Sequence, residues 1–269
     1  MQYEWIKNVA DMSSDYTIIE FYDKFNQKIE PNTLPENLTF LMFGNKFNQK
    51  IEPNILPRKL TMLTFGDWFN QKIEPNTLPR KLTTLTFGDW FNQKIELNTL
   101  PENLTTLIFG FHFNQKIDPN ILSKNLTTLI FGYSFNQEIE PNTLPENLSI
   151  LTFGRNFNQE IESKMLSSNL KNINFDWTDF NKDNSYEHYI KMVNNIPGYY
   201  HVKIFLRDNK FGNSGLKWPL HIVNYRKNNW SSNIYEIQDK YNHKIYGSIT
   251  ILINKETYQP YSSAKSARK

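Results

Sequence analysis

The chain has 269 residues, a formal net charge of +3 and no cysteine. The lack of cysteine excludes disulfides, thiolate metal sites and cysteine nucleophiles. The mild charge argues against a dedicated nucleic-acid binder, which usually carries a strong basic stripe. No apolar run reaches the about 18 residues of a membrane-spanning helix, and Met1–Ser14 lacks the apolar core of a signal peptide. We therefore expect an intracellular, cytoplasmic protein that is not secreted by a classical signal and binds neither membrane nor nucleic acid.

Residues 1–15 are predicted to form an N-terminal cap. Tyr3, Trp5, Ile6 and Val9 have partly helical spacing and enough apolar character to cover one end of a repeat array. Repeat proteins need such caps because an open end exposes both core side chains and a sheet edge.

Residues 16–181 repeat one pattern with a fixed period of 22 residues. The sequence Phe-Asn-Gln-Lys/Glu-Ile begins at seven phenylalanines: Phe25, Phe47, Phe69, Phe91, Phe113, Phe135 and Phe157. A period of about 20 to 50 residues is typical of a solenoid, in which each unit packs only on its neighbours. The units also contain Leu-x-x-Leu-x-Phe, with Ile173 for the second leucine in the last one, and its alternation predicts a short strand with one buried face. With an earlier match at Ile19 and Phe21, we expect about eight strands in a single parallel sheet.

The return side of each unit is predicted to lack regular helix. Gly88 and its equivalents end most strands, with Tyr22 and Asp176 as exceptions, and glycine can adopt positive φ in a turn there. The segment Glu-Pro-Asn-x-Leu-Pro holds two prolines in most copies, and proline disfavours a helix interior. We therefore expect irregular or 3₁₀ structure, with little or no α-helix.

One asparagine follows each repeated phenylalanine: Asn26, Asn48, Asn70, Asn92, Asn114, Asn136 and Asn158. A tight coil turns backbone N–H and C=O groups inward at its corner, and a buried amide side chain satisfies both kinds of group. We therefore interpret these residues as a structural ladder rather than as ligand or catalytic residues. The glutamine that follows each asparagine is expected to lie on the surface.

These patterns resemble the FNIP repeat, a short leucine-rich-repeat-like unit. The resemblance rests on Phe-Asn, Ile, Leu-Pro and Leu-x-x-Leu-x-Phe-Gly in constant register from about Tyr16 to Asn181. Leu97 and Ser163 depart from it, because other copies have proline there. Such proteins are typical of social amoebae and of giant viruses that infect amoebae, and the region from Lys217 is similar to the giant-virus members. The resemblance implies a protein-interaction role without enzymatic activity, and a host protein is one candidate partner.

Residues 182–269 are expected to form a small α+β unit with a frayed basic tail. Ser185–Asn195 has the pattern of a helix. Four runs have the pattern of strands: Tyr200–Leu206, Leu220–Tyr225, Ile234–Ile237 and Tyr246–Ile253.

No catalytic or metal-binding motif occurs in the sequence. Four of the five histidines lie in the C-terminal unit without metal-ligand spacing: His188, His201, His221 and His243. The phosphate-binding, dinucleotide-binding, nucleophile-elbow and zinc-protease motifs are also missing. We therefore predict a protein that is not an enzyme and needs no cofactor or metal.

The two positions before each Phe-Asn pair vary most between units. Aromatic residues there are expected side by side along one edge of the solenoid, which we call the aromatic rim: Trp68, Trp90, Phe111, His112 and Tyr133. Aromatic residues are enriched at binding hot spots, although these side chains could instead only stack on one another. A second candidate surface is the apolar outer face of the strands at Phe40, Met42 and Met62.

The resulting prediction is a non-enzymatic protein–protein interaction scaffold. One alternative is a ligand-binding or enzymatic C-terminal unit that the solenoid targets, with a pocket lined by residues such as His201, His221, Asp208 and Asp239. The other is carbohydrate binding on the aromatic rim. The sequence does not predict the identity of the partner or the oligomeric state.

Overall fold

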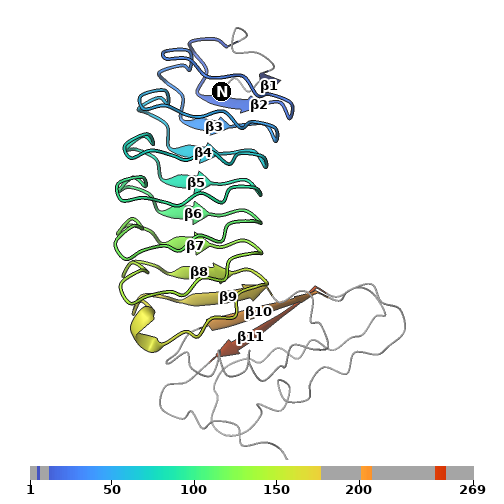
Figure 1. Ribbon diagram of the computed structural model, residues 1–269, viewed down its shortest axis with the longest axis vertical. Helices are drawn as coiled ribbons and strands as arrows, with labels where there is room; N and C mark the ends of the chain where they lie inside the picture. The colour runs from blue at the N-terminus through green and yellow to red at the C-terminus, as the bar shows by residue number, and fades with distance from the viewer. Residues whose placement is uncertain (1–4, 7–11, 177–200, 208–245, 253–269) are drawn as a thin grey trace, which may run out of the picture.

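The computed structural model describes residues 5–6, 12–176, 201–207 and 246–252. Their strands form one sheet that follows chain order, from β1 to β11, and the coils stack along one axis (Figure 1). The eight strands β2 to β9 belong to the repeats: Ile18–Phe21, Phe40–Met42, Met62–Thr64, Thr84–Thr86, Thr106–Ile108, Thr128–Ile130, Ile150–Phe153 and Asn172–Asp176. They pair in parallel, which confirms the predicted single-sheet solenoid.

The constant period determines the register of these strands. Leu63 lies opposite Leu85, which in turn lies opposite Leu107, so equivalent residues are direct neighbours. The central residue of each short strand points inward and its two neighbours point outward. A shift by one residue would turn the leucines to solvent, so the buried face keeps the register.

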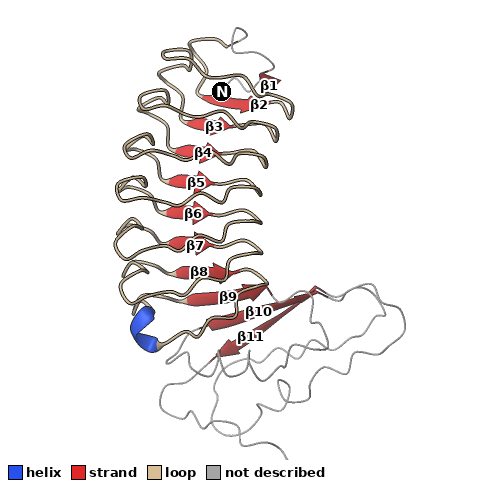
Figure 2. Cartoon of the chain, in the orientation of Figure 1, coloured by secondary structure: helices blue, strands red, loops and turns tan. Residues whose placement is uncertain are grey.

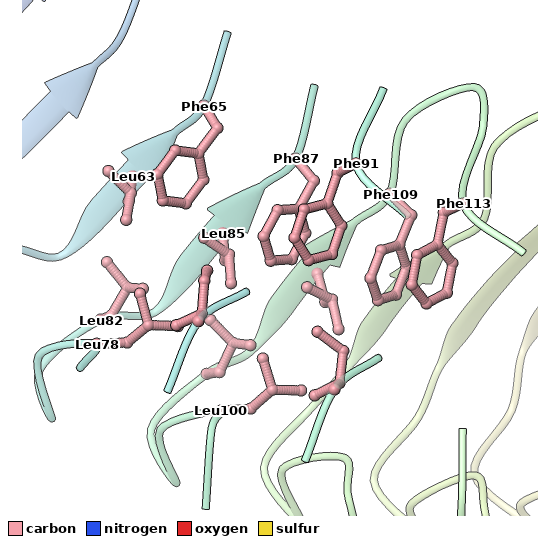
Figure 3. Close-up of a cluster of buried hydrophobic side chains, with 14 of the residues drawn as sticks. Leu63, Phe65, Leu78, Leu82, Leu85, Phe87, Phe91, Leu100, Phe109 and Phe113 are labelled. Atoms are coloured by element: carbon pink, nitrogen blue, oxygen red, sulfur yellow. The ribbon is translucent and has the colours of Figure 1, made fainter. Parts of the chain in front are cut away.

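The core consists of rows of identical side chains that run along the solenoid axis (Figure 3). In one coil the rings of Phe87 and Phe91 stack with centroids 3.8 Å apart. Phe87 also stacks on Phe109 of the next coil at 5.5 Å. Each buried phenylalanine contributes about 1.5–3 kcal/mol of hydrophobic stabilisation, so the stacked rows hold the coils together.

The return side of each coil consists of turns, as predicted, and a short 3₁₀ helix, η2 (Ser163–Met165), occurs in the last coil (Figure 2). In the other coils this segment forms a β-turn, as at Pro75-Asn76, where Thr77 N–H donates to Glu74 O at 3.2 Å. Asn76 has a φ of 62°. A β-turn with proline, which cannot have positive φ, as its second residue and positive φ at its third residue is a type II turn.

The glycine that follows the strands β3 to β8 has a different role from the one expected. Its φ lies outside the left-handed region, which the asparagines of the Pro-Asn turns occupy instead. A Cβ atom on Gly88 would lie 2.0 Å from the carbonyl oxygen of Gly66 in the previous coil. Glycine is needed because the two backbones approach too closely for a side chain.

The first strand, β1 (Trp5–Ile6), extends the sheet at its N-terminal end. It pairs in parallel with β2, so the helical spacing expected for the cap is wrong for these two residues. Pairing is favourable there because it satisfies backbone groups at an otherwise open sheet edge. Tyr3 and Val9 lie outside the described residues.

The sheet also continues beyond the repeats. Strand β10 (His201–Arg207) pairs in parallel with β9, and β11 (Tyr246–Leu252) pairs antiparallel with β10. These strands agree with two of the predicted runs. The predicted helix at 185–195 and the other two predicted strands lie outside the described residues, as do all candidate pocket residues except His201. The division of the chain at residue 182 stays a prediction.

Candidate functional site

The asparagine ladder is a set of acceptors that connect neighbouring coils. The Oδ1 atom of Asn92 accepts a hydrogen bond from the backbone N–H of Asn114 at 2.9 Å and another from Gln115 Nε2 at 3.2 Å. The same pattern joins Asn70 to Asn92 and Gln93. The glutamines therefore take part in the ladder, although the sequence suggested a surface role.

The asparagine side chains are not fully buried, which corrects the expected environment. Asn26 and Asn158 are exposed, and the five asparagines between them are half-buried. In each of these bonds the side-chain oxygen accepts from a backbone N–H of the next coil, so the ladder satisfies donors at the coil corner. The asparagines thus join neighbouring coils by hydrogen bonds.

The aromatic rim lies on the turns into which the strands run, at the right of the solenoid in Figure 1. Phe69 N–H donates to Gly66 O at 3.1 Å, which closes a four-residue turn with Trp68 near its tip. Trp68 N–H also donates to Asn45 O of the previous coil at 2.9 Å, and Trp90 N–H donates to Asp67 O at 2.8 Å. The rim therefore has a backbone fixed by bonds within and between coils.

The rim side chains form two offset rows. Trp90 stacks on His112 with centroids 4.3 Å apart, and Phe111 stacks on Tyr133 at the same separation. Phe111 also meets His112 edge to face at 4.8 Å, which links the rows. Trp68 and Trp90 are nevertheless each 54% exposed, and Phe111 is 40% exposed. The side chains contact one another and still present a large aromatic surface to solvent.

Two cations flank the aromatic side chains, and the sequence did not single them out. Lys46 Nζ lies 4.8 Å from the ring centroid of Trp68. At the other end, Arg155 Cζ lies 5.3 Å from the ring of Tyr133. Both occupy the variable positions before Phe-Asn, so the 22-residue period would have placed them in line with the aromatic residues. Cation–π contacts of this kind hold the outer rings in place.

A short acidic row accompanies the tryptophans. Burial raises the pKa of the Asp67 carboxyl above its ordinary value of 3.8, and the nearby carboxylates of Asp89 and Asp23 raise it further. Because the folded-state pKa is raised, this charge opposes folding once it is ionised. The protonated Asp67 carboxyl therefore favours the folded state fully at pH values below its ordinary pKa. This contribution to stability is lost as the pH rises through the raised pKa.

The second candidate surface is the outer face of the first repeat strands. Phe40 lies directly opposite Met62 on neighbouring strands, and Met42 lies diagonally to Met62. Met42 is 38% exposed and Met62 is 41% exposed, whereas Phe40 is half-buried. The three side chains form an apolar area at the N-terminal part of the sheet.

Within the described ranges, no three histidine, aspartate or glutamate side chains are grouped so that they could hold a metal ion. The same ranges contain no helix with the length and apolar character needed to cross a bilayer. The rim presents exposed aromatic side chains with a cation at each end.

Comparison with known proteins identifies the repeat. The sequence model of the FNIP repeat matches residues 25–68, 69–112 and 113–156 in tandem. Among solved structures, the chain is similar to CroV588, a giant-virus protein described as a novel circular LRR protein structure, with 45% identity and a TM-score of 0.63. The match covers 75% of this chain and 28% of CroV588, so this chain spans under a third of that protein's length. No curated protein matches significantly.

Proposed function

We propose that this protein, which belongs to the FNIP-repeat family, is a non-enzymatic scaffold that binds a protein partner through its aromatic rim. The observation that carries the proposal is the exposure of Trp68 and Trp90 on a repeat whose inward residues hardly change. At the same turn positions other coils have Lys24, Lys46 and Ser134, so stacking of the coils does not require tryptophan.

The rigidity of the rim supports a binding role. Inter-coil hydrogen bonds hold its backbone, and the stacked pairs hold its side chains. A surface that is ordered before association loses less conformational freedom when a partner binds. Tryptophan, tyrosine and arginine are the residues most enriched at hot spots; the rim contains the first two types, and Arg155 flanks it.

The charges beside the rim suggest how a partner is oriented. Lys46 and Arg155 lie at opposite ends of the aromatic rows, and Asp67 and Asp89 lie beside the tryptophans. Complementary charges on a partner would set its position along the solenoid axis. The apolar face around Met42 and Met62 is a second contact area that a larger partner could reach.

We propose a host-cell protein as the partner to search for, because CroV588 is a giant-virus protein. An enzymatic or ligand-binding unit in 182–269 and carbohydrate binding on the rim both remain predictions. No observation on the described residues favours either of them.

The double variant Trp68→Ala/Trp90→Ala tests the proposal. A partner captured from amoebal lysate with the wild-type chain is purified, and its affinity for each variant is measured by isothermal titration calorimetry. Truncation of a hot spot removes about 2 kcal/mol or more, so we expect a loss of at least about 30-fold in affinity with an unchanged melting temperature. The control is Leu97→Ala, an apolar residue with 58% exposure on the return side, which should not change the affinity.

Two results would contradict the proposal. If the double variant keeps the wild-type affinity, the rim is not the binding site. If its melting temperature falls well below that of the Leu97→Ala control, the two tryptophans stabilise the fold instead.

A further inference from the structure

A cluster of four basic residues lies on the edge of the sheet opposite the aromatic rim. We call it the basic patch: Arg58, Lys59, Arg80 and Lys81. All four are exposed. Each pair occupies the middle of a turn just before its strand, at the left of the solenoid in Figure 1, and the turns are closed by Leu60 N–H to Pro57 O at 3.1 Å and Leu82 N–H to Pro79 O at 3.0 Å. The patch is therefore presented on two adjacent, ordered turns.

The packing of the coils does not favour these residues. In later coils the third residue of the turn is asparagine, and its Nδ2 donates to a carbonyl of the previous coil, as Asn103 does to Arg80 O at 2.8 Å. The same bond is made by Asn125, Asn147 and Asn169. Lys59 and Lys81 replace this asparagine in two consecutive coils. Lys59 Nζ instead donates to Asn37 Oδ1 at 2.6 Å.

The patch also places like charges next to one another. Arg58 and Arg80 are equivalent residues of neighbouring coils, whose strands lie about 4.8 Å apart, and like charges facing each other across paired strands are destabilising. Lysines of the Phe-Asn-Gln-Lys segment are neutralised, for example Lys50 by Glu52 at 3.2 Å. Among the described residues, no ion pair involves any of the four basic side chains. Folding thus accounts for neither the residue types nor their grouping.

We propose that the basic patch binds an acidic segment of a protein partner, in which aspartate or glutamate residues are clustered. The guanidinium groups of Arg58 and Arg80 present planar donors that match carboxylates, and the two lysines add point charges beside them. This surface is separate from the aromatic rim, so the inference goes beyond the proposed function and does not depend on it.

The limits of the patch favour a short acidic segment over nucleic acid. The equivalent residue is Glu36 in the coil before and Glu102 in the coil after, and both are exposed. The positive charge therefore ends after two coils, with a carboxylate on each side. A nucleic-acid strand carries negative charge along its whole length, so it would be repelled by these carboxylates. Binding of such a strand requires an extended basic track, and the patch is shorter than that.

The test uses the full chain and a fluorescein-labelled octaglutamate peptide, with binding measured by fluorescence anisotropy. The patch variant is Arg58→Ser/Lys59→Asn/Arg80→Ser/Lys81→Asn, which copies Ser168–Asn169 of the last coil and allows the asparagine hydrogen bond to form. The matched control is Lys28→Glu/Lys50→Glu, which copies Glu138 at the equivalent position and lowers the formal net charge by the same four units. We expect the patch variant to bind at least about tenfold more weakly and the control to stay within about twofold of wild type.

Other outcomes would overturn the inference. An equal loss in both variants would show that net charge alone attracts the peptide. Unchanged binding in the patch variant would place the site elsewhere. A single-stranded oligonucleotide of equal charge that binds more tightly than the peptide, with the same dependence on the patch, would assign the surface to nucleic acid. If the patch variant fails to fold, Arg58→Gln/Arg80→Gln is measured instead, with a smaller loss expected in the same direction.

Discussion

At the scale of single residues, one repeat position shows how a polar atom can be left without a partner. The residue after the asparagine of the type II turn is isoleucine at Ile55 and Ile121 and threonine in the other coils that form this turn. Thr77, Thr99 and Thr143 are buried, and their hydroxyls have no hydrogen-bond partner in the described part of the chain. A buried hydroxyl without a partner costs free energy that an apolar side chain would not.

We predict that Thr77→Ile stabilises the protein. The substitution removes an unsatisfied hydroxyl, whose burial costs about 1–3 kcal/mol, and copies a side chain that the coils at Ile55 and Ile121 already accommodate. Thermal unfolding should show a higher melting temperature. Thr33→Ile is the control, because the Thr33 hydroxyl donates to Glu30 O and its loss offsets the gain. A lower melting temperature for Thr77→Ile would show that the pocket at this coil is too small.

At the scale of elements, the type II turn after Glu96 explains a departure from the repeat. Leu97 occupies the position at which other coils have proline, and it is 58% exposed. The turn is nevertheless the same, since Asn98 has positive φ and Thr99 N–H bonds Glu96 O. The backbone at Leu97 is therefore already in a conformation that proline adopts in the equivalent turns.

We predict that Leu97→Pro stabilises the protein by about 0.4–1 kcal/mol. Proline restricts the unfolded chain and fits this turn without strain, as Pro75 and Pro119 do in the same place. Chemical denaturation should show a higher midpoint with little change in slope. Ser163→Pro is a contrasting control, because the last coil forms a 3₁₀ helix there instead of the type II turn. A lower midpoint for Leu97→Pro would mean that the Leu97 backbone differs from that of the other coils.

At the scale of the whole molecule, each described repeat strand pairs only with the strands before and after it in the sheet. Neighbouring repeat strands pair with one another along the entire solenoid. Stability is then approximately a sum of coil terms and interface terms. A disturbance at one interface should therefore stay local at first and weaken both adjacent coils.

We predict that Gly88→Ala weakens the interface between the coils of β4 and β5. The new Cβ would lie 2.0 Å from Gly66 O, so the backbones must separate, and the cost should reach at least the about 1–3 kcal/mol typical of overpacking. Hydrogen exchange should accelerate most at amides that bond across this interface, such as Trp90 N–H to Asp67 O and Asn92 N–H to Asn70 Oδ1. Thr86→Ala, on the outer face of β5, is the control. Uniformly faster exchange along the chain would contradict nearest-neighbour coupling.

Sequence alone determined the period, the strand positions, the inward rows and the lack of helix on the return side. These features follow from local alternation and from proline, and a constant period of 22 residues brings equivalent residues together. The sequence also identified the residues of the aromatic rim.

Only the tertiary structure decided the role of each glycine, the acceptor role of the asparagines, the pairing of β1 and β10 with the repeat sheet, and the stacking partners of the rim. It also exposed the basic patch, whose doublets Arg58–Lys59 and Arg80–Lys81 are ordinary surface residues when read along the chain. The physical reason is that these properties depend on distances between adjacent coils, whereas the pattern within one coil reports only which side chains face inward.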